Sequence, residues 1–356
     1  MRTCQNLKFD GRSSGMLTKI GLDLGYANIT LSDAASGIYR EPSVALVDKD
    51  SRKISAVGNA ALMGDGEDGA SGMLVRPFKS GLLFDKGITA GIIDNAVRVA
   101  TSSGSVRCVF GVPSDILPKQ EREIADMLLK SGVKECLFVN RAMAALVGAG
   151  YSPRISAIVV DVGAGSTEIM VLHKGDILYQ KRAAIGGEDF DKAVRQYIAD
   201  QGDVNVSLSV SKAIKERLGA VWQGRVDETI DIEGTLALTG NKVKMSISTE
   251  DIVGVFEKPL RELLTVVSDG VQKIPAEFVG DIFENGIILT GGGSEMYGLD
   301  IMMGKVLDIS VTTPENPINC VAKGLSRINN IIPTDVRANG KNITEDLAAL
   351  YDRNRQ

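Results

Sequence analysis

The stretch ISAIVVDVGAGSTEI, residues Ile155–Ile169, decides the fold of this chain. It opens with an apolar, β-branched run that predicts a buried strand, and a second apolar run returns after a glycine-rich turn. Backbone N–H groups in a turn with so little side-chain bulk approach phosphate oxygens closely, and the carboxylate of Asp161 at its edge suits a hydrated Mg²⁺. An ordinary tight turn with an acidic residue at its edge would explain this sequence equally well, so the hairpin alone leaves both interpretations open.

The same plan occurs a second time in Ile20–Leu31. An apolar strand runs into Asp23, a glycine turn begins at Gly25, and another apolar strand returns. A third glycine cluster, Gly291–Gly293, follows an apolar strand as well. Two hairpins with an aspartate at the strand end, together with this late glycine turn, indicate two related halves around one nucleotide.

Composition narrows the class of protein. The chain has 356 residues, which is enough for two α/β domains, and its net charge of −5 argues against a general nucleic-acid binder. His173 is the single histidine and lies at the end of a predicted strand, which argues strongly against both a Ser–His–Asp triad and a multi-histidine metal site. The scattered cysteines follow no metal-ligand spacing and predict reduced thiols: Cys4, Cys108, Cys136 and Cys320. Without an apolar run of transmembrane length or a signal-peptide core, the expected location is cytoplasmic.

Strands and helices alternate along the chain, which predicts an α/β fold with mostly parallel sheet cores and local hairpins. One long helix is expected from Ser248 or Thr249 to about Lys273. The boundary between two domains is expected near Gly150–Pro153. The predicted organisation is a flexible lead-in at 1–16, a first domain at 17–152 with a small subdomain inserted at about 33–76, a second domain at 153–332 with a small subdomain at about 200–260, and a polar tail at 333–356.

An ordered set of segments resembles the actin / Hsp70 / sugar-kinase superfamily and, within it, the bacterial actin MreB family. The segments, in chain order, are GLDLGYAN, EPSVALV, VRPFKSGLLFD, FGVPSDILPKQER, AMAALVGAG, VVDVGAGSTEI, GIILTGGG and VAKGLSRI, and they span Met16–Ile328. The resemblance implies an actin-like fold of two related α/β domains, each with a mixed sheet flanked by helices. It also implies that ATP or ADP binds between them with Mg²⁺.

The site residues follow from the same resemblance. It implies water-mediated Mg²⁺ orientation by Asp23 and Asp161. It implies two phosphate loops, the first made of Gly25, Tyr26, Ala27 and Asn28 and the second of Gly163, Ala164 and Gly165. It places the adenosine near Lys215, Glu216, Gly292, Gly293, Ser294 and Glu295. For Lys215 and Glu216, a solvated helix face is an equally good interpretation.

The chain departs from the family where hydrolysis would occur. MreB has a Glu-Glu-Pro-Met-Ala-Ala stretch whose second glutamate lies near the attacking water, and Arg141 stands at that position here. Arginine does not accept a proton at neutral pH, because its pKa exceeds about 12. Tyr26 also replaces a small threonine of the first loop. Weak or absent hydrolysis is therefore expected, with Glu168 as an alternative water-ordering residue.

The resemblance predicts a subunit of head-to-tail filaments that serve cell shape or intracellular organisation, together with organising partner proteins and without nucleic acid. The loop Thr101–Ser105 and the N-terminal residues Met1–Gly15 lack an apolar face, which argues against direct membrane binding. The expected location is therefore the cytoplasm, with any place at the inner face of the membrane reached through partners. Two alternatives remain open: a non-polymerising nucleotide-dependent regulator or scaffold, and, more weakly, a phosphotransferase.

Overall fold

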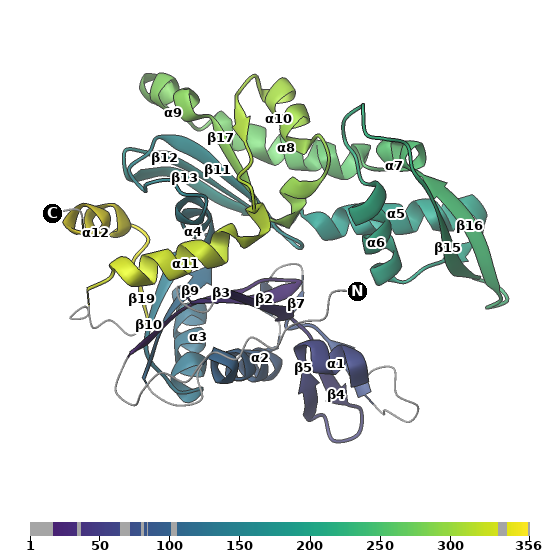
Figure 1. The fold of residues 1–356 in the computed structure, drawn as a ribbon, viewed down its shortest axis with the longest axis horizontal. Coiled ribbons are helices and arrows are strands. Elements are labelled where there is room, and N and C mark those ends of the chain that lie inside the picture. Colours follow the sequence, from purple (N-terminus) through teal and green to yellow (C-terminus); the bar gives the residue numbers. More distant parts are fainter. Residues whose placement is uncertain are drawn as a thin grey trace. The chain divides into compact units, whose positions relative to one another are not determined.

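The computed structural model describes residues 17–33, 37–64, 72–79, 82–83, 85–100, 105–333 and 340–354, and Figure 1 shows their fold. They belong to two compact units. Unit 1 comprises Met1–Ile155, Lys174–Asp176 and Asn319–Gln356, and unit 2 comprises Ser156–His173 and Ile177–Ile318. The lead-in at 1–16 and most of the polar loop at 101–105 lie outside the described residues. The domain bounds expected from the sequence stay a prediction.

Unit 1 is built on a six-stranded sheet with the order β19-β10-β9-β1-β2-β3. The strands β19, β10, β9 and β1 run parallel, while β2 and β3 continue the sheet as an antiparallel meander. Their bounds are β1 (Thr18–Leu24), β2 (Asn28–Asp33), β3 (Gly37–Pro42), β9 (Val106–Val112), β10 (Val133–Asn140) and β19 (Lys341–Asn342). Smaller sheets pair β4 (Ala45–Asp48) with β5 (Ile54–Val57) and β6 (Gly72–Val75), and β7 (Phe78–Lys79) with β8 (Leu82–Leu83).

Helices cover both faces of the large sheet of unit 1 (Figure 1). Successive residues of β1 point to opposite faces of the sheet, so alternate positions meet different helices. Ile20 and Leu22 join the apolar core with α2 and α3, whereas a Cβ on Gly21 would lie only 2.7 Å from Leu325 of α11. The helices of unit 1 are α1 (Gly58–Gly64), α2 (Lys86–Ala100), α3 (Pro118–Lys130), α4 (Arg141–Gly148), α11 (Cys320–Ile331) and α12 (Leu347–Arg353).

The helices α4 and α11 meet backbone to backbone. A Cβ on Gly148 would lie 1.7 Å from the carbonyl oxygen of Cys320, and a Cβ on Gly324 would lie 1.8 Å from that of Ala144. Only glycine leaves room for this approach, and the small residues of α4 are otherwise buried. The close approach places every residue of α4 from Ala142 to Gly148 in the interior.

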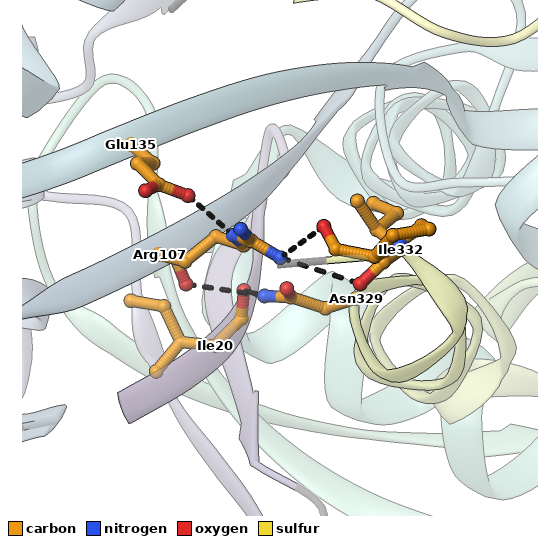
Figure 2. A network of polar contacts seen from close by, with 6 residues as sticks. Ile20, Arg107, Glu135, Asn329 and Ile332 are labelled. Atoms are coloured by element: carbon orange, nitrogen blue, oxygen red, sulfur yellow. Dashed lines mark hydrogen bonds and ion pairs between the residues drawn. The ribbon is translucent and has the colours of Figure 1, made fainter. Parts of the chain in front are cut away.

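A buried arginine fixes the C-terminal end of α11 to the sheet (Figure 2). The side chain of Arg107 on β9 is fully buried. Its Nε donates to Glu135 Oε2 at 2.6 Å, and its Nη1 donates to the carbonyl oxygens of Ile332 and Pro333 at 3.3 and 3.2 Å. Asn329 of α11 donates to the carbonyl oxygens of Ile20 and Arg107, at 2.8 and 3.1 Å. Residues distant in sequence are thereby joined at one place in unit 1.

Unit 2 is built on a five-stranded sheet with the order β13-β12-β11-β17-β18. Its strands are β11 (Ala157–Val162), β12 (Thr167–His173), β13 (Asp176–Ala183), β17 (Ile287–Thr290) and β18 (Val311–Thr312). A second sheet joins β14 (Val204–Asn205), β15 (Thr229–Leu236) and β16 (Lys242–Ser248). The helices are α5 (Gly187–Gly202), α6 (Leu208–Leu218), α7 (Thr249–Val255), α8 (Glu257–Val271), α9 (Val279–Asn285) and α10 (Leu299–Leu307), with 3₁₀ turns η1 (Ala276–Phe278) and η2 (Gly292–Glu295), while η3 (Pro317–Asn319) ends at the unit boundary.

The long helix expected from Ser248 to about Lys273 is wrong in one respect. Ser248 does cap a helix, because its hydroxyl accepts from the backbone N–H of Asp251, but the helix breaks at Phe256 into α7 and α8. Pro259 explains the break. A proline inside a continuous helix would clash with the carbonyl four residues earlier, whereas in the first turn of a new helix it costs little.

Candidate functional site

The central hairpin places three polar side chains in one row of the unit 2 sheet. Asp161 on β11 is paired with Glu168 on β12 and with Thr290 on β17. Directly paired residues share a face of a sheet, so their side chains are neighbours. All three are buried, and the Thr290 hydroxyl donates to Asp161 Oδ1 at 2.8 Å. The predicted carboxylate at the strand end is thus held in a fixed orientation.

The loop of that hairpin is fastened by the first turn of α5. The N–H of Gly187 donates to the Gly163 carbonyl at 2.9 Å, and the N–H of Glu188 donates to the Ala164 carbonyl at 2.7 Å. In a trans peptide the N–H points opposite to the C=O of the same unit. The N–H groups of Ala164 and Gly165 therefore point away from α5, which is the arrangement of backbone donors that binds anions.

The late glycine turn is pressed against the end of β11. Gly291 has a φ of +84°, and a Cβ there would lie 2.4 Å from the carbonyl oxygen of Val162. A Cβ on Gly293 would lie 2.3 Å from the Val162 side chain. Within η2, the buried hydroxyl of Ser294 donates to the Gly291 carbonyl at 2.7 Å, while Gly292 and Glu295 are exposed. Glycine is required here so that this turn can adjoin the strand that leads into the Gly163 loop.

Lys215 and Glu216 have different surroundings. The ammonium of Lys215 pairs with Asp191 Oδ1 at 2.8 Å and donates to the Gly187 carbonyl at 2.9 Å, so it ties α6 to the first turn of α5. Burial raises the pKa of the Asp191 carboxyl, and the neighbouring Lys215 charge offsets part of that effect. Glu216 is exposed and lies 3.6 Å from Lys212 one turn earlier. Lys215 thus lies near the second loop, and Glu216 lies on the open helix face.

The first hairpin is built in the same way as the central one. Asp23 is paired with Thr30 on β2 and with Gly111 on β9. The turn closes through the N–H of Gly25, which donates to the Asn28 carbonyl at 2.9 Å. Ser43 is buried beside this loop and donates hydrogen bonds to its backbone.

Ser43 contacts the loop twice, since its hydroxyl donates to the Gly25 carbonyl at 2.8 Å and its N–H donates to the Ala27 carbonyl at 2.9 Å. The N–H of Tyr26 therefore points away from Ser43. The guanidinium of Arg76 also lies 3.5 and 3.4 Å from the carbonyl oxygens of Tyr26 and Ala27. The Tyr26 side chain is half-buried.

Arg141 points at the carboxylate of Asp23. It is the first residue of α4, directly after β10, and Asn140 caps the helix by accepting from the N–H groups of Ala142 and Met143. Its Nε and Nη2 both lie 2.8 Å from Asp23 Oδ1, and Nη2 also donates to the Leu24 carbonyl. The two side chains are 15% and 18% exposed, so this pair is largely withdrawn from water.

The two predicted magnesium-orienting carboxylates differ in how well they fit that role. Mg²⁺ is usually held by one or two carboxylates together with water and phosphate. Asp161, with Glu168 beside it, fits this description. Asp23 fits it less well, because its Oδ1 already accepts from two N–H groups of the Arg141 guanidinium. Among the described residues, His, Cys, Asp and Glu form no group of three or more that would hold a metal ion by protein ligands alone.

The structure brings together the predicted groups of each unit. In unit 2 these are Asp161, Glu168, the Gly163–Gly165 loop and the Gly291–Glu295 turn, with Lys215 nearby. In unit 1 they are Asp23, Arg141 and the Gly25–Asn28 loop. Sequence reasoning missed the residues that hold the loops in place. Thr290 directly precedes the glycine cluster and Ser43 lies in a segment already noted, so both had a local signal; Asp191 had none.

Comparisons with known proteins agree on the family. The family model described as MreB/Mbl protein matches residues 17–335. The cell shape-determining protein Mbl of Bacillus cereus (strain ATCC 10987 / NRS 248) is 30% identical over 312 residues, covering 86% of this chain and 93% of that protein. The cell shape-determining protein MreB of Escherichia coli (strain K12) is 28% identical over 328 residues, covering 89% and 94%.

Solved structures show the same fold. MreB5 of Spiroplasma citri bound to ADP superimposes with a TM-score of 0.83 at 22% identity, covering 88% of this chain and 97% of that one. The MamK double helical filament gives 0.76 at 20% identity, covering 89% and 100%. The predicted actin-like α/β fold is confirmed. Within the described part of the chain, no helix has the length and apolar character needed to cross a membrane. From the family model and the curated relatives together, this chain is a member of the MreB/Mbl family.

Proposed function

We propose that this chain binds ATP or ADP and assembles head-to-tail into filaments that serve cell shape or intracellular organisation. Two curated relatives are named cell shape-determining proteins. Solved neighbours are described as bound to ADP, bound to AMPPNP, and as a double helical filament. In this proposal the chain acts in the cytoplasm, and any place at the inner face of the membrane is reached through protein partners.

The observation that carries nucleotide binding is the fastening of the second loop. The carbonyls of Gly163 and Ala164 accept hydrogen bonds from the first turn of α5. The loop is therefore already ordered, with the N–H groups of Ala164 and Gly165 pointing away from α5, and this lowers the ordering cost of binding phosphate. Asp161, oriented by Thr290, would hold Mg²⁺ through water, and the ion would neutralise phosphate charge. The Gly291–Glu295 turn and Lys215 supply the adenosine side.

Hydrolysis is weak or absent in this proposal. General-base assistance contributes about 10²- to 10⁴-fold to a rate, and the guanidinium of Arg141 does not provide it. Arg141 is also held at Asp23, so it is not positioned to order water. Glu168 remains the alternative water-ordering group.

The nucleotide site is tested by calorimetric titration of the full chain with Mg-ATP. Asp161→Ala should weaken binding about tenfold or more, the size of one charge-assisted contact, and should weaken it more than Asp23→Asn does. Asp269→Asn removes an exposed carboxylate of α8 whose Lys181 partner is 3.6 Å away, and it serves as the control. Equal affinities for wild type and the Asp161 variant would sink the proposed site.

Assembly is tested by sedimentation and negative-stain microscopy with ATP, with ADP and without nucleotide. Filaments are expected with nucleotide. Monomers under every condition, in a preparation that binds ATP, would favour a second function, a non-polymerising nucleotide-dependent regulator or scaffold. The Arg141–Asp23 pair favours that second candidate, because it fits retained binding without turnover.

A further inference from the structure

The Arg141–Asp23 pair lies next to the backbone of the first loop, Gly25–Asn28. A Cβ built on Gly25 would be 3.9 Å from Arg141 Nη2 and 3.9 Å from Asp23 Oδ2. A Cβ built on Gly111 of β9 would be 3.4 Å from Asp23 Oδ1 and 3.5 Å from Arg141 Cγ. These are ordinary contact distances, so the carboxylate and the guanidinium both adjoin the backbone at Gly25 and at Gly111.

The charges next to this loop affect how strongly it binds a polyphosphate. The carboxylate of Asp23 without a counter-charge would repel the anion, and a divalent cation would be needed to offset that repulsion. In this chain the guanidinium contacts one carboxylate oxygen through two N–H groups at 2.8 Å. With side chains only 15% and 18% exposed, the pair is weakly screened by solvent, so the negative charge of Asp23 is cancelled locally.

The backbone makes the pair a fixed part of unit 1. Asp23 is anchored in a strand with neighbours on both sides. Arg141 leaves from the capped first turn of α4, and its Nη2 also donates to the Leu24 carbonyl. The guanidinium is thereby held against both the side chain of Asp23 and the main chain that follows it, before any ligand arrives.

We propose that Arg141 is a resident counter-charge for Asp23, which replaces at the first loop the compensation that a hydrated Mg²⁺ would give. The inference rests on the proposed nucleotide binding and concerns its metal dependence. Magnesium is oriented from Asp161 alone, and Asp23 contributes no part of the Mg²⁺ dependence of binding while Arg141 is present.

The test measures one ratio for each variant of the full chain: the Kd for ATP in excess EDTA divided by the Kd for ATP in saturating MgCl₂. Arg141→Gln exposes the charge of Asp23 to the polyphosphate, so this ratio should rise about tenfold or more, as expected for one charge-assisted interaction. The double variant Arg141→Gln/Asp23→Asn carries neither charge, and its ratio should return to the wild-type value. Arg98→Gln is the control, because it breaks another Arg–Asp contact of 2.8 Å, on α2.

The outcomes separate the inference from the function beneath it. A ratio for Arg141→Gln equal to that of wild type overturns the counter-charge and leaves nucleotide binding standing. A double variant with a ratio as high as Arg141→Gln overturns it as well, because Arg141 would then act on the phosphate directly. If wild type binds no ATP in either buffer, the proposed function itself fails. Circular dichroism confirms that each variant is folded, and an unfolded Arg141→Gln is replaced by Arg141→Lys, whose single ammonium should give an intermediate ratio.

Discussion

Removing the buried guanidinium of Arg107 tests what holds the C-terminal end of α11 against the large sheet of unit 1. Arg107→Met keeps most of the buried volume and removes the charge together with the donors to Glu135, Ile332 and Pro333. Breaking a buried ion pair costs about 3–5 kcal/mol. Glu135 remains 26% exposed and recovers part of its hydration, so we expect about 3 kcal/mol of lost stability.

The partner variant should cost more. Glu135→Ala leaves the fully buried guanidinium without its counter-charge, and we expect about 4 kcal/mol for it. The double variant Arg107→Met/Glu135→Ala should cost clearly less than the sum, because the second change then removes no charge pair. A sum that is strictly additive would refute the view that this pair acts as a unit.

The assay has to distinguish the two units. Trp222 is the single tryptophan and lies in unit 2, so its fluorescence follows that unit alone during urea unfolding. Far-UV circular dichroism follows the whole chain, and hydrogen exchange of the α11 amides reports the local effect. We expect faster exchange in α11 with an unchanged Trp222 transition. Loss of protection in unit 2 peptides and none in α11 would contradict the reasoning.

Three further predictions concern packing, pH and thiols. Gly324→Ala should cost about 1–3 kcal/mol or more in urea unfolding, because its Cβ would overlap a carbonyl of α4, whereas Gly254→Ala, which meets nothing within 4 Å, should be neutral or slightly stabilising. Hydrogen bonds from the backbone N–H and the hydroxyl of Ser248 lower the pKa of Asp251. The stability that these bonds provide is therefore present above pH about 4 and is lost as the pH falls through the lowered pKa. The difference in melting temperature between wild type and Asp251→Asn should therefore shrink in acid, and a constant difference would refute this. Burial raises the pKa of Cys108 and of Cys136, so Ellman's reagent should label neither in the native chain and both in urea; rapid native labelling at these two positions would contradict it.

The local parts of the fold were predictable from sequence. A continuous apolar, β-branched run and a glycine turn are short-range signals, and the predicted Ile155–Ile169 hairpin appears as β11 and β12. The break at Phe256 was missed because the apolar spacing continues across it, although Pro259 was visible. The short strand β19 was also missed, since its partner β10 lies about 200 residues earlier and only tertiary packing places them together.

The glycine loops of the candidate site were predictable from sequence, but the residues that hold those loops in place were not. The glycine loops carry their own signal, and the resemblance assigned the position of Arg141. Its contact with Asp23 joins residues 118 positions apart, and no spacing in the sequence reports such a contact. Ser43 and Asp191 were overlooked for the same reason, because serine and aspartate are common at surfaces and gain their roles only when buried beside a loop.

The division of the chain into units has a consequence for its synthesis. Unit 2 occupies Ser156–Ile318 with one short interruption, whereas unit 1 needs α11 from beyond that stretch. A ribosome therefore delivers all of unit 2 before the helix that covers Gly21 and packs on Gly148 exists. Domains usually mature in the order in which they are translated. Here the part translated first has to wait for α11, which packs on β1 and β9 beside α4, until the part translated second is complete.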